Sequence, residues 1–234
     1  MDLPPLPLPV LLTQHWADVT FVHWPVDPDA VAHHFPPGTR PDVSDDGTYV
    51  GLIPLVVGRS TVGEKLPLGY LGSFAETNVR LYSVDDAGRH GVLFRSLETQ
   101  RSAVVPLTRI GLGVPYTWAK MRVDRPGGQI SYTSVRRWPG RGVRSHLTVD
   151  VGSPVDPTPL EVWLTARWGA HTRKAGRSWW VPITHPMWPL HTARVAELSD
   201  ELVAAAGIGA TGERLRALYS PGVPVRFGRP AAIG

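Results

Sequence analysis

Prolines and glycines, 24 of each, occur throughout this chain of 234 residues and limit its fold more than any other feature. Long helices have little room between them, because proline breaks a helix interior and glycine favours turns. The pattern favours many short strands joined by turns. A hydrophobic fraction of 42% is enough for a packed core. We expect an extended, proline-rich arm over residues 1–13 and a single domain over 14–234.

Alternation of apolar and polar residues predicts roughly ten strands. The clearest predicted strands cover 18–24, 74–84 and 119–123. The predicted short helices cover 27–35, 98–110 and 199–206. A glycine- and proline-rich loop over 58–72 is long enough to act as a lid or an interface element. Together these elements predict an α+β domain that is mostly antiparallel β, for which a closed or conical barrel is one arrangement.

The strand over 74–84 carries an unusual row of side chains. Residues two apart on a strand share a face, so one face is small and apolar and suits a core. The other face carries Phe74, Glu76, Asn78, Arg80 and Tyr82. A carboxylate, an amide and a guanidinium between two aromatic rings are typical either of a solvated face or of the wall of a ligand cavity. The pattern leaves both interpretations open.

Lysine is rare here, and only Lys65, Lys120 and Lys174 are present. Lys120 follows Trp118 and Ala119 in a largely apolar stretch. A lysine in an apolar setting can lose its proton and attack a carbonyl group, whereas arginine stays protonated. The alternative is a structural lysine whose stem covers apolar surface while its amine reaches water.

Several motifs follow one another in a characteristic order. They are Phe21-Val-His-Trp-Pro25, Tyr49-Val-Gly-Leu-Ile-Pro54, Phe74-Ala-Glu-Thr-Asn-Val-Arg80, Pro115-Tyr116 with Trp118-Ala-Lys-Met121, and His185-Pro-Met-Trp-Pro-Leu190. This order, over about residues 14–228, resembles a bacterial family of proteins of unknown function, DUF2071, a distant relative of acetoacetate decarboxylase. The resemblance implies a conical, mostly antiparallel β-barrel with a central cavity, and oligomers are common among such proteins.

The resemblance also implies roles for individual residues. In acetoacetate decarboxylase a lysine forms a Schiff base with the substrate ketone, and a glutamate lies beside it. Lys120 and Glu76 are the corresponding catalytic candidates. The decarboxylase carries two adjacent lysines after a proline, whereas Pro115 here is followed by Tyr116 and Thr117. The residues expected to bind substrate are Arg80, Asn78, Phe74, Tyr82, Tyr116, Trp118, Arg122 and His185.

Two functions follow from these candidates. The first is a Schiff-base lyase of decarboxylase, aldolase or dehydratase type, in which a small anionic, keto acid-like molecule occupies the cavity and an arginine clamps its carboxylate. The second is a binding protein that uses the same cavity without covalent chemistry. We expect a homo-oligomer under either hypothesis.

Other classes are disfavoured by charge and spacing. The formal charge is +4, and the densest arginines lie over 136–144 without the stripe of a nucleic-acid binder. The histidines lack metal-site spacing and no cysteine is present, so we expect neither a metal nor another cofactor. The apolar N-terminus is interrupted by prolines, and no apolar run has membrane-spanning length. We therefore expect a cytoplasmic protein without a membrane or nucleic-acid partner.

Overall fold

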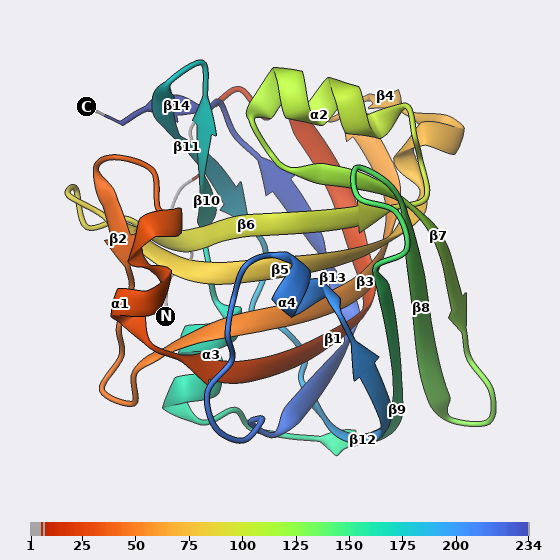
Figure 1. The fold of residues 1–234 in the computed structure, drawn as a ribbon. Coiled ribbons are helices and arrows are strands. Elements are labelled where there is room, and N and C mark those ends of the chain that lie inside the picture. The colour runs from red at the N-terminus through yellow and green to blue at the C-terminus, as the bar shows by residue number, and fades with distance from the viewer. Residues whose placement is uncertain (1–5, 7, 234) are drawn as a thin grey trace.

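The computed structural model describes residues 6 and 8–233, in which long strands dominate and helices are short (Figure 1). The elements in chain order are β1 (Leu12–Val26), α1 (Pro28–Val31), η1 (Ala32–His34), β2 (Thr39–Pro41), β3 (Thr48–Val62), β4 (Leu66–Pro67), η2 (Gly69–Gly72), β5 (Phe74–Asp85), β6 (His90–Thr99), α2 (Val104–Leu112), β7 (Tyr116–Asp124), β8 (Gln129–Trp138), β9 (Arg144–Pro154), α3 (Pro159–Thr165), β10 (Gly169–Lys174), β11 (Arg177–Thr184), β12 (His191–Asp200), α4 (Leu202–Ala205), β13 (Ala217–Phe227) and β14 (Ala231–Ala232). No helix in this part of the chain is both long and apolar enough to span a membrane.

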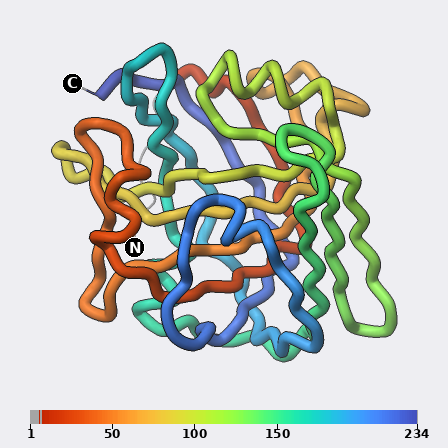
Figure 2. The backbone as a smooth tube through the Cα atoms, viewed as in Figure 1, coloured from red at the N-terminus to blue at the C-terminus, as the bar shows by residue number. Residues whose placement is uncertain are grey.

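The strands form one continuous sheet that closes on itself twice (Figures 1 and 2). One ring runs β6-β7-β8-β9-β12-β13-β1-β3-β5 and returns to β6. A second ring shares β13, β1, β3, β5 and β6, and is completed by β10 and β11, because β11 pairs with β13 and β10 with β6. Among the described strands, the pairs β6–β7 and β6–β10 are parallel and the others are antiparallel. The predicted fold class, α+β with mostly antiparallel strands, is confirmed.

β5 is buried along its whole length because its two faces pack into different cores. Val79 and Leu81 belong to a core that β8, β9 and β12 share with β1, β3 and β5. Phe74 and Tyr82 belong to the other core, with Leu164 of α3 and strands β11 and β13. The row predicted on one face of this strand therefore points into the second ring, and solvent does not cover it.

Several predicted boundaries differ from the observed ones. The loop expected over 58–72 is largely regular, because β3 continues to Val62 and is followed by β4 and η2. Glu98 belongs to β6, so α2 starts only at Val104, and Pro106 falls in its first turn, where its missing N–H costs little. The helix expected over 199–206 shortens to α4, and the Asp200 carboxylate accepts a hydrogen bond from the backbone N–H of Val203 at 3.0 Å.

The C-terminal part of the predicted arm joins the sheet. Leu12 and Thr13 pair with Phe227 and Arg226 of β13, and the Leu11 N–H donates to the Phe227 carbonyl at 2.8 Å. This pairing carries β1 along the wall of the second ring. Residues 1–5 and 7 of the arm predicted over 1–13 lie outside the described residues.

Candidate functional site

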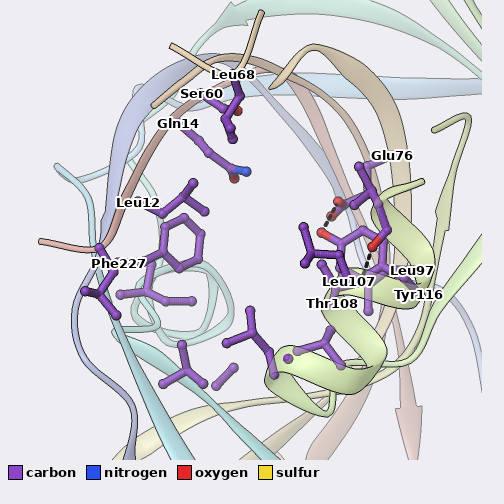
Figure 3. A pocket seen from close by; sticks show the side chains of 18 of the residues that line it. Leu12, Gln14, Ser60, Leu68, Glu76, Leu97, Leu107, Thr108, Tyr116 and Phe227 are labelled. Atoms are coloured by element: carbon purple, nitrogen blue, oxygen red, sulfur yellow. Dashed lines mark hydrogen bonds between the residues drawn. The ribbon is translucent and has the colours of Figure 1, made fainter. Parts of the chain in front are cut away.

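A cavity of about 420 Å³ lies inside the second ring, beneath α2 (Figure 3). Apolar side chains from distant parts of the chain form most of its wall; among them are Leu12, Phe74, Leu97, Leu107, Ile183 and Phe227. None of the lining residues in the described part of the chain is a lysine or an arginine. The cavity therefore suits an apolar molecule better than an anion.

The carboxyl group of Glu76 is the ionisable acid of this wall, and it faces Tyr116 (Figure 3). Glu76 lies on β5, whereas Tyr116 begins β7, and β6 lies between these two strands. The Tyr116 hydroxyl donates a hydrogen bond to Glu76 Oε2 at 2.7 Å. The Glu76–Tyr116 pair is a polar spot in a mostly apolar wall.

Burial decides the acidity of this pair. Glu76 is only 4% exposed, and loss of water raises its carboxyl pKa from 4.5 to about 7, although hydrogen bonds from Tyr116 and Asn78 act in the opposite direction. Burial, followed by the neighbouring carboxylate, raises the pKa of the Tyr116 hydroxyl well above its ordinary value. Glu76 therefore changes between a hydrogen-bond donor and an acceptor close to neutral pH.

Other polar groups in the wall are largely satisfied by the protein. The Ser60 hydroxyl donates to the Gly72 carbonyl at 2.7 Å, and the Thr108 hydroxyl donates to the Val104 carbonyl at 2.8 Å. Gln14 extends from the opposite wall, and its oxygen accepts from the Trp16 indole at 2.8 Å (Figure 3). Glu76, Tyr116 and the Gln14 amide nitrogen are the groups left to orient a ligand.

Arg80 and Tyr82 point into the same ring but lie beyond the cavity. The Arg80 guanidinium donates to the Leu164 carbonyl at 3.0 Å and to the Tyr82 hydroxyl at 3.3 Å. A buried ion pair between Arg167 and Asp42 lies next to this cluster, since Arg167 is also over the Tyr82 ring. These contacts fill the α3 end of the ring, so Arg80 does not reach the cavity that Glu76 lines.

Asn78 and His185 are likewise buried outside the cavity lining. The His185 ring lies 4.7 and 4.9 Å from the rings of Trp168 and Trp188, between centroids. Burial lowers its pKa, and its contacts with backbone carbonyls only partly oppose this effect. His185 therefore belongs to the aromatic core rather than to the cavity wall. The Asn78 side-chain oxygen is also buried, and it has no protein hydrogen-bond partner.

The structure does not bring Lys120 and Glu76 together. β7 pairs with β6 only over Tyr116–Trp118, and beyond that point it pairs with β8 alone. Lys120 is exposed on the same side of β7 as Trp118, and both line a separate, open groove on the outside of the molecule. Arg122 is also exposed, and its guanidinium donates to Asp124 at 2.8 Å.

The remaining candidate centres are structural in character. Arg136 is buried in β8 and forms an ion pair with Glu98 at 2.5 Å, which removes it from the basic cluster predicted over 136–144. Among the described residues, no group of three or more histidine, aspartate or glutamate side chains is arranged to hold a metal ion.

Sequence reasoning missed much of the cavity wall. Leu12 and Gln14 come from the end of the predicted arm, and Phe227 comes from the last long strand, so no local pattern joins them. Helical spacing does indicate that Val104, Leu107 and Thr108 share an α2 face. It does not indicate that this face covers a cavity.

Comparisons with known proteins agree with this architecture. Residues 13–224 match DUF2071, a family described as an uncharacterized conserved protein. The uncharacterized protein YqjF of Bacillus subtilis (strain 168) is 26% identical over 198 residues, which cover 84% of this chain and 81% of YqjF.

Solved structures with related folds include three enzymes at low sequence identity. Acetoacetate decarboxylase from Legionella pneumophila is 12% identical with a TM-score of 0.70, covering 97% of this chain and 88% of its own. The enduracididine biosynthesis enzyme MppR, complexed with pyruvate, is 16% identical with a TM-score of 0.69, and the match covers 97% of this chain and 92% of the MppR chain. An acetoacetate decarboxylase-like enzyme from Sphingomonas wittichii RW1 is 15% identical with a TM-score of 0.66, and the match covers 97% of this chain and 94% of the enzyme's chain. Since the DUF2071 match spans most of the sequence, this protein belongs to the DUF2071 family and has the acetoacetate decarboxylase-like fold.

Proposed function

We propose that this protein binds a small, largely apolar and uncharged molecule in the cavity of the second ring. The ligand's carbonyl or hydroxyl group contacts Glu76 and Tyr116. The composition of the wall carries this proposal, because it is apolar except for a few polar groups. A volume of about 420 Å³ is in the ordinary range of small-molecule sites. The pyruvate complex of MppR supports the use of this fold for small ligands.

An uncharged ligand is favoured over the keto acid expected from the sequence. A carboxylate buried in this cavity would need a cation, and the described lining supplies none. Arg80, the predicted clamp, already donates to Leu164 and Tyr82. An ionised Glu76 would in addition repel a second carboxylate.

Binding without a Schiff base is favoured by the position of the amines. Lys120 lines the outer groove rather than the cavity. Where the decarboxylase carries two lysines after a proline, Pro115 is followed here by Tyr116 and Thr117, and the Tyr116 hydroxyl contacts Glu76. A phenol and a carboxyl group can orient a carbonyl or exchange a proton with it, but they cannot form an imine.

Calorimetric titration with matched ligands tests this function. We expect a medium-chain 2-ketone to bind, and the 2-oxo acid of equal carbon number to bind much more weakly. Thr108→Phe, which places a ring in the cavity, should weaken ketone binding, whereas Val43→Phe on the surface outside the lining should not. Tighter binding of the keto acid, or equal affinities for both variants, would contradict the proposal.

A second candidate function is proton transfer at the carbon next to a bound carbonyl. Its support is the Glu76 pKa of about 7 inside a ligand-sized cavity, which suits a general base at neutral pH. Glu76 would take a proton from the α-carbon and return one to it, so that the ketone exchanges hydrogen for deuterium in D₂O. Proton NMR should show this exchange with the wild type and lose it with Glu76→Gln. Binding without exchange would leave the protein as a binding protein.

A further inference from the structure

Apolar side chains continue from the cavity to the surface around α2. We call this exposed set the apolar collar; it consists of Leu11, Val62, Leu66, Tyr70, Leu71, Leu107, Ile110 and Leu112. Leu107 and Ile110 are 73% and 75% exposed. Leu11, Leu71 and Leu107 also line the cavity, so the collar surrounds its mouth. α2 and β4 lie near each other at this end of the molecule, away from α3 (Figure 1).

The helix α2 is apolar on both its inner and its outer side. Val105 is buried, and Val104 and Thr108 line the cavity. Leu107, at the mouth of the cavity, and Ile110, outside the lining, are both largely exposed and would be polar on an ordinary surface helix, because such helices keep their apolar residues on one buried face. A contiguous exposed apolar patch of this kind marks an interaction surface.

Basic side chains border the collar. The Arg101 guanidinium lies 3.6 Å from the centre of the Tyr70 ring, and the Lys174 amine donates to the Gly111 carbonyl at the end of α2 at 2.7 Å. Lys65 is exposed and precedes the collar residue Leu66 in the chain. Glu64, the acid beside Lys65, forms an ion pair with Arg226. The border of the mouth is therefore positively charged.

The exposed apolar side chains and the basic border together indicate which kind of surface could cover the collar. In a two-fold pair of copies, the same patch meets itself, so the basic residues of one border would face those of the other. A lipid bilayer with anionic headgroups instead attracts this border and accepts leucine, isoleucine and tyrosine side chains at the boundary of headgroups and acyl chains.

We propose that the apolar collar docks on an anionic lipid bilayer and that the cavity exchanges its ligand with the membrane there. In the docked state the mouth opens toward the acyl chains, so an apolar molecule enters without crossing water. Lys65 and Lys174 contact phosphate groups while the aliphatic stems remain near the collar. The exchange step rests on the proposed ligand-binding function, whereas the docking step does not.

Vesicle co-sedimentation of the full chain tests docking. We expect the protein to pellet with vesicles of phosphatidylcholine and phosphatidylglycerol, much less with phosphatidylcholine alone, and less at high salt. The double variant Ile110→Gln, Leu66→Gln removes two collar side chains outside the cavity lining and should weaken vesicle binding by about tenfold or more. Val43→Gln changes an exposed apolar residue outside the collar and is the matched control, with unchanged binding expected.

Two results would overturn docking. The first is absence of pelleting with the anionic vesicles, or equal pelleting of the double variant and the wild type. The second is a dimer detected by light scattering that the double variant disperses, since this would assign the collar to a second copy of the chain. Ketone titration of the wild type without vesicles, set beside its pelleting with vesicles, separates the two proposals. Vesicle binding without ketone binding refutes the ligand-binding function alone, and ketone binding without vesicle binding refutes docking alone.

Discussion

Replacing Glu76 with glutamine should change how the stability of this protein depends on pH. Glu76 is nearly fully buried beside Tyr116, and its pKa is raised from 4.5 to about 7 in the folded state. The glutamine side chain of the variant does not titrate between acidic and alkaline pH, because an amide does not ionise in this range. The variant therefore removes one titration while it keeps nearly the same shape.

The linkage between proton binding by Glu76 and folding gives the direction and size of the change in unfolding free energy. Below pH 4.5 the carboxyl group is protonated in both the folded and unfolded states, so its contribution to stability is fully present. As pH rises from 4.5 to 7, the unfolded state releases the proton while the folded state keeps it, and stability is lost. The difference between the two pKa values corresponds to a loss of about 3 kcal/mol, complete above the folded pKa.

Urea unfolding at several pH values between 4 and 9 measures this effect as the difference in unfolding free energy between Glu76→Gln and the wild type. We expect the variant to gain about 3 kcal/mol relative to the wild type between the acidic and alkaline ends of the series. Any cost of the substituted amide is a constant offset, so it does not alter this trend. Parallel stability curves for the two proteins would show that the Glu76 carboxyl group has the same pKa in the folded and unfolded states, against this prediction.

Three further predictions address individual contacts. Tyr116→Phe removes a hydrogen bond that stabilises the Glu76 carboxylate, so the pKa of Glu76 should rise further in a carbon-13 NMR titration; an unchanged or lower value would contradict this. Asp42→Asn leaves the buried Arg167 guanidinium without its ion-pair partner and should lower the unfolding free energy by about 3–5 kcal/mol in urea, whereas a change as small as that of a surface substitution would count against the pair. Lys120→Arg should leave ketone affinity unchanged in calorimetric titration, and lost affinity would instead indicate a role for Lys120 in binding.

The row of side chains that includes Glu76 was predictable from the sequence because it depends on a local rule. Alternation along β5 puts Phe74, Glu76 and Tyr82 on one face, but it leaves open whether that face is solvated or lines a cavity. The structure places all three side chains inside the second ring. Tyr116 was a candidate through the motif that follows Pro115, and it contacts Glu76 as part of the same wall.

The surroundings of the other candidates depend on contacts between distant segments. Arg80 donates to the Leu164 carbonyl, 84 residues away, and this contact lies at the α3 end of the ring, outside the cavity lining. Lys120 lies on the same side of β7 as the exposed Trp118, whereas the other side, with Ala119, is buried. Neither the partner of Arg80 nor the choice of which side of β7 faces outward is contained in a local pattern of residues.

Titration with N-phenyl-1-naphthylamine, an uncharged apolar probe that fluoresces in apolar surroundings, tests whether the cavity holds a ligand. We predict saturable fluorescence with the wild type, displacement of the probe by a medium-chain 2-ketone, and strongly reduced binding in Thr108→Phe. Equal binding of the probe by Thr108→Phe and the wild type would contradict ligand binding in the cavity, since the probe would then occupy a site outside this cavity.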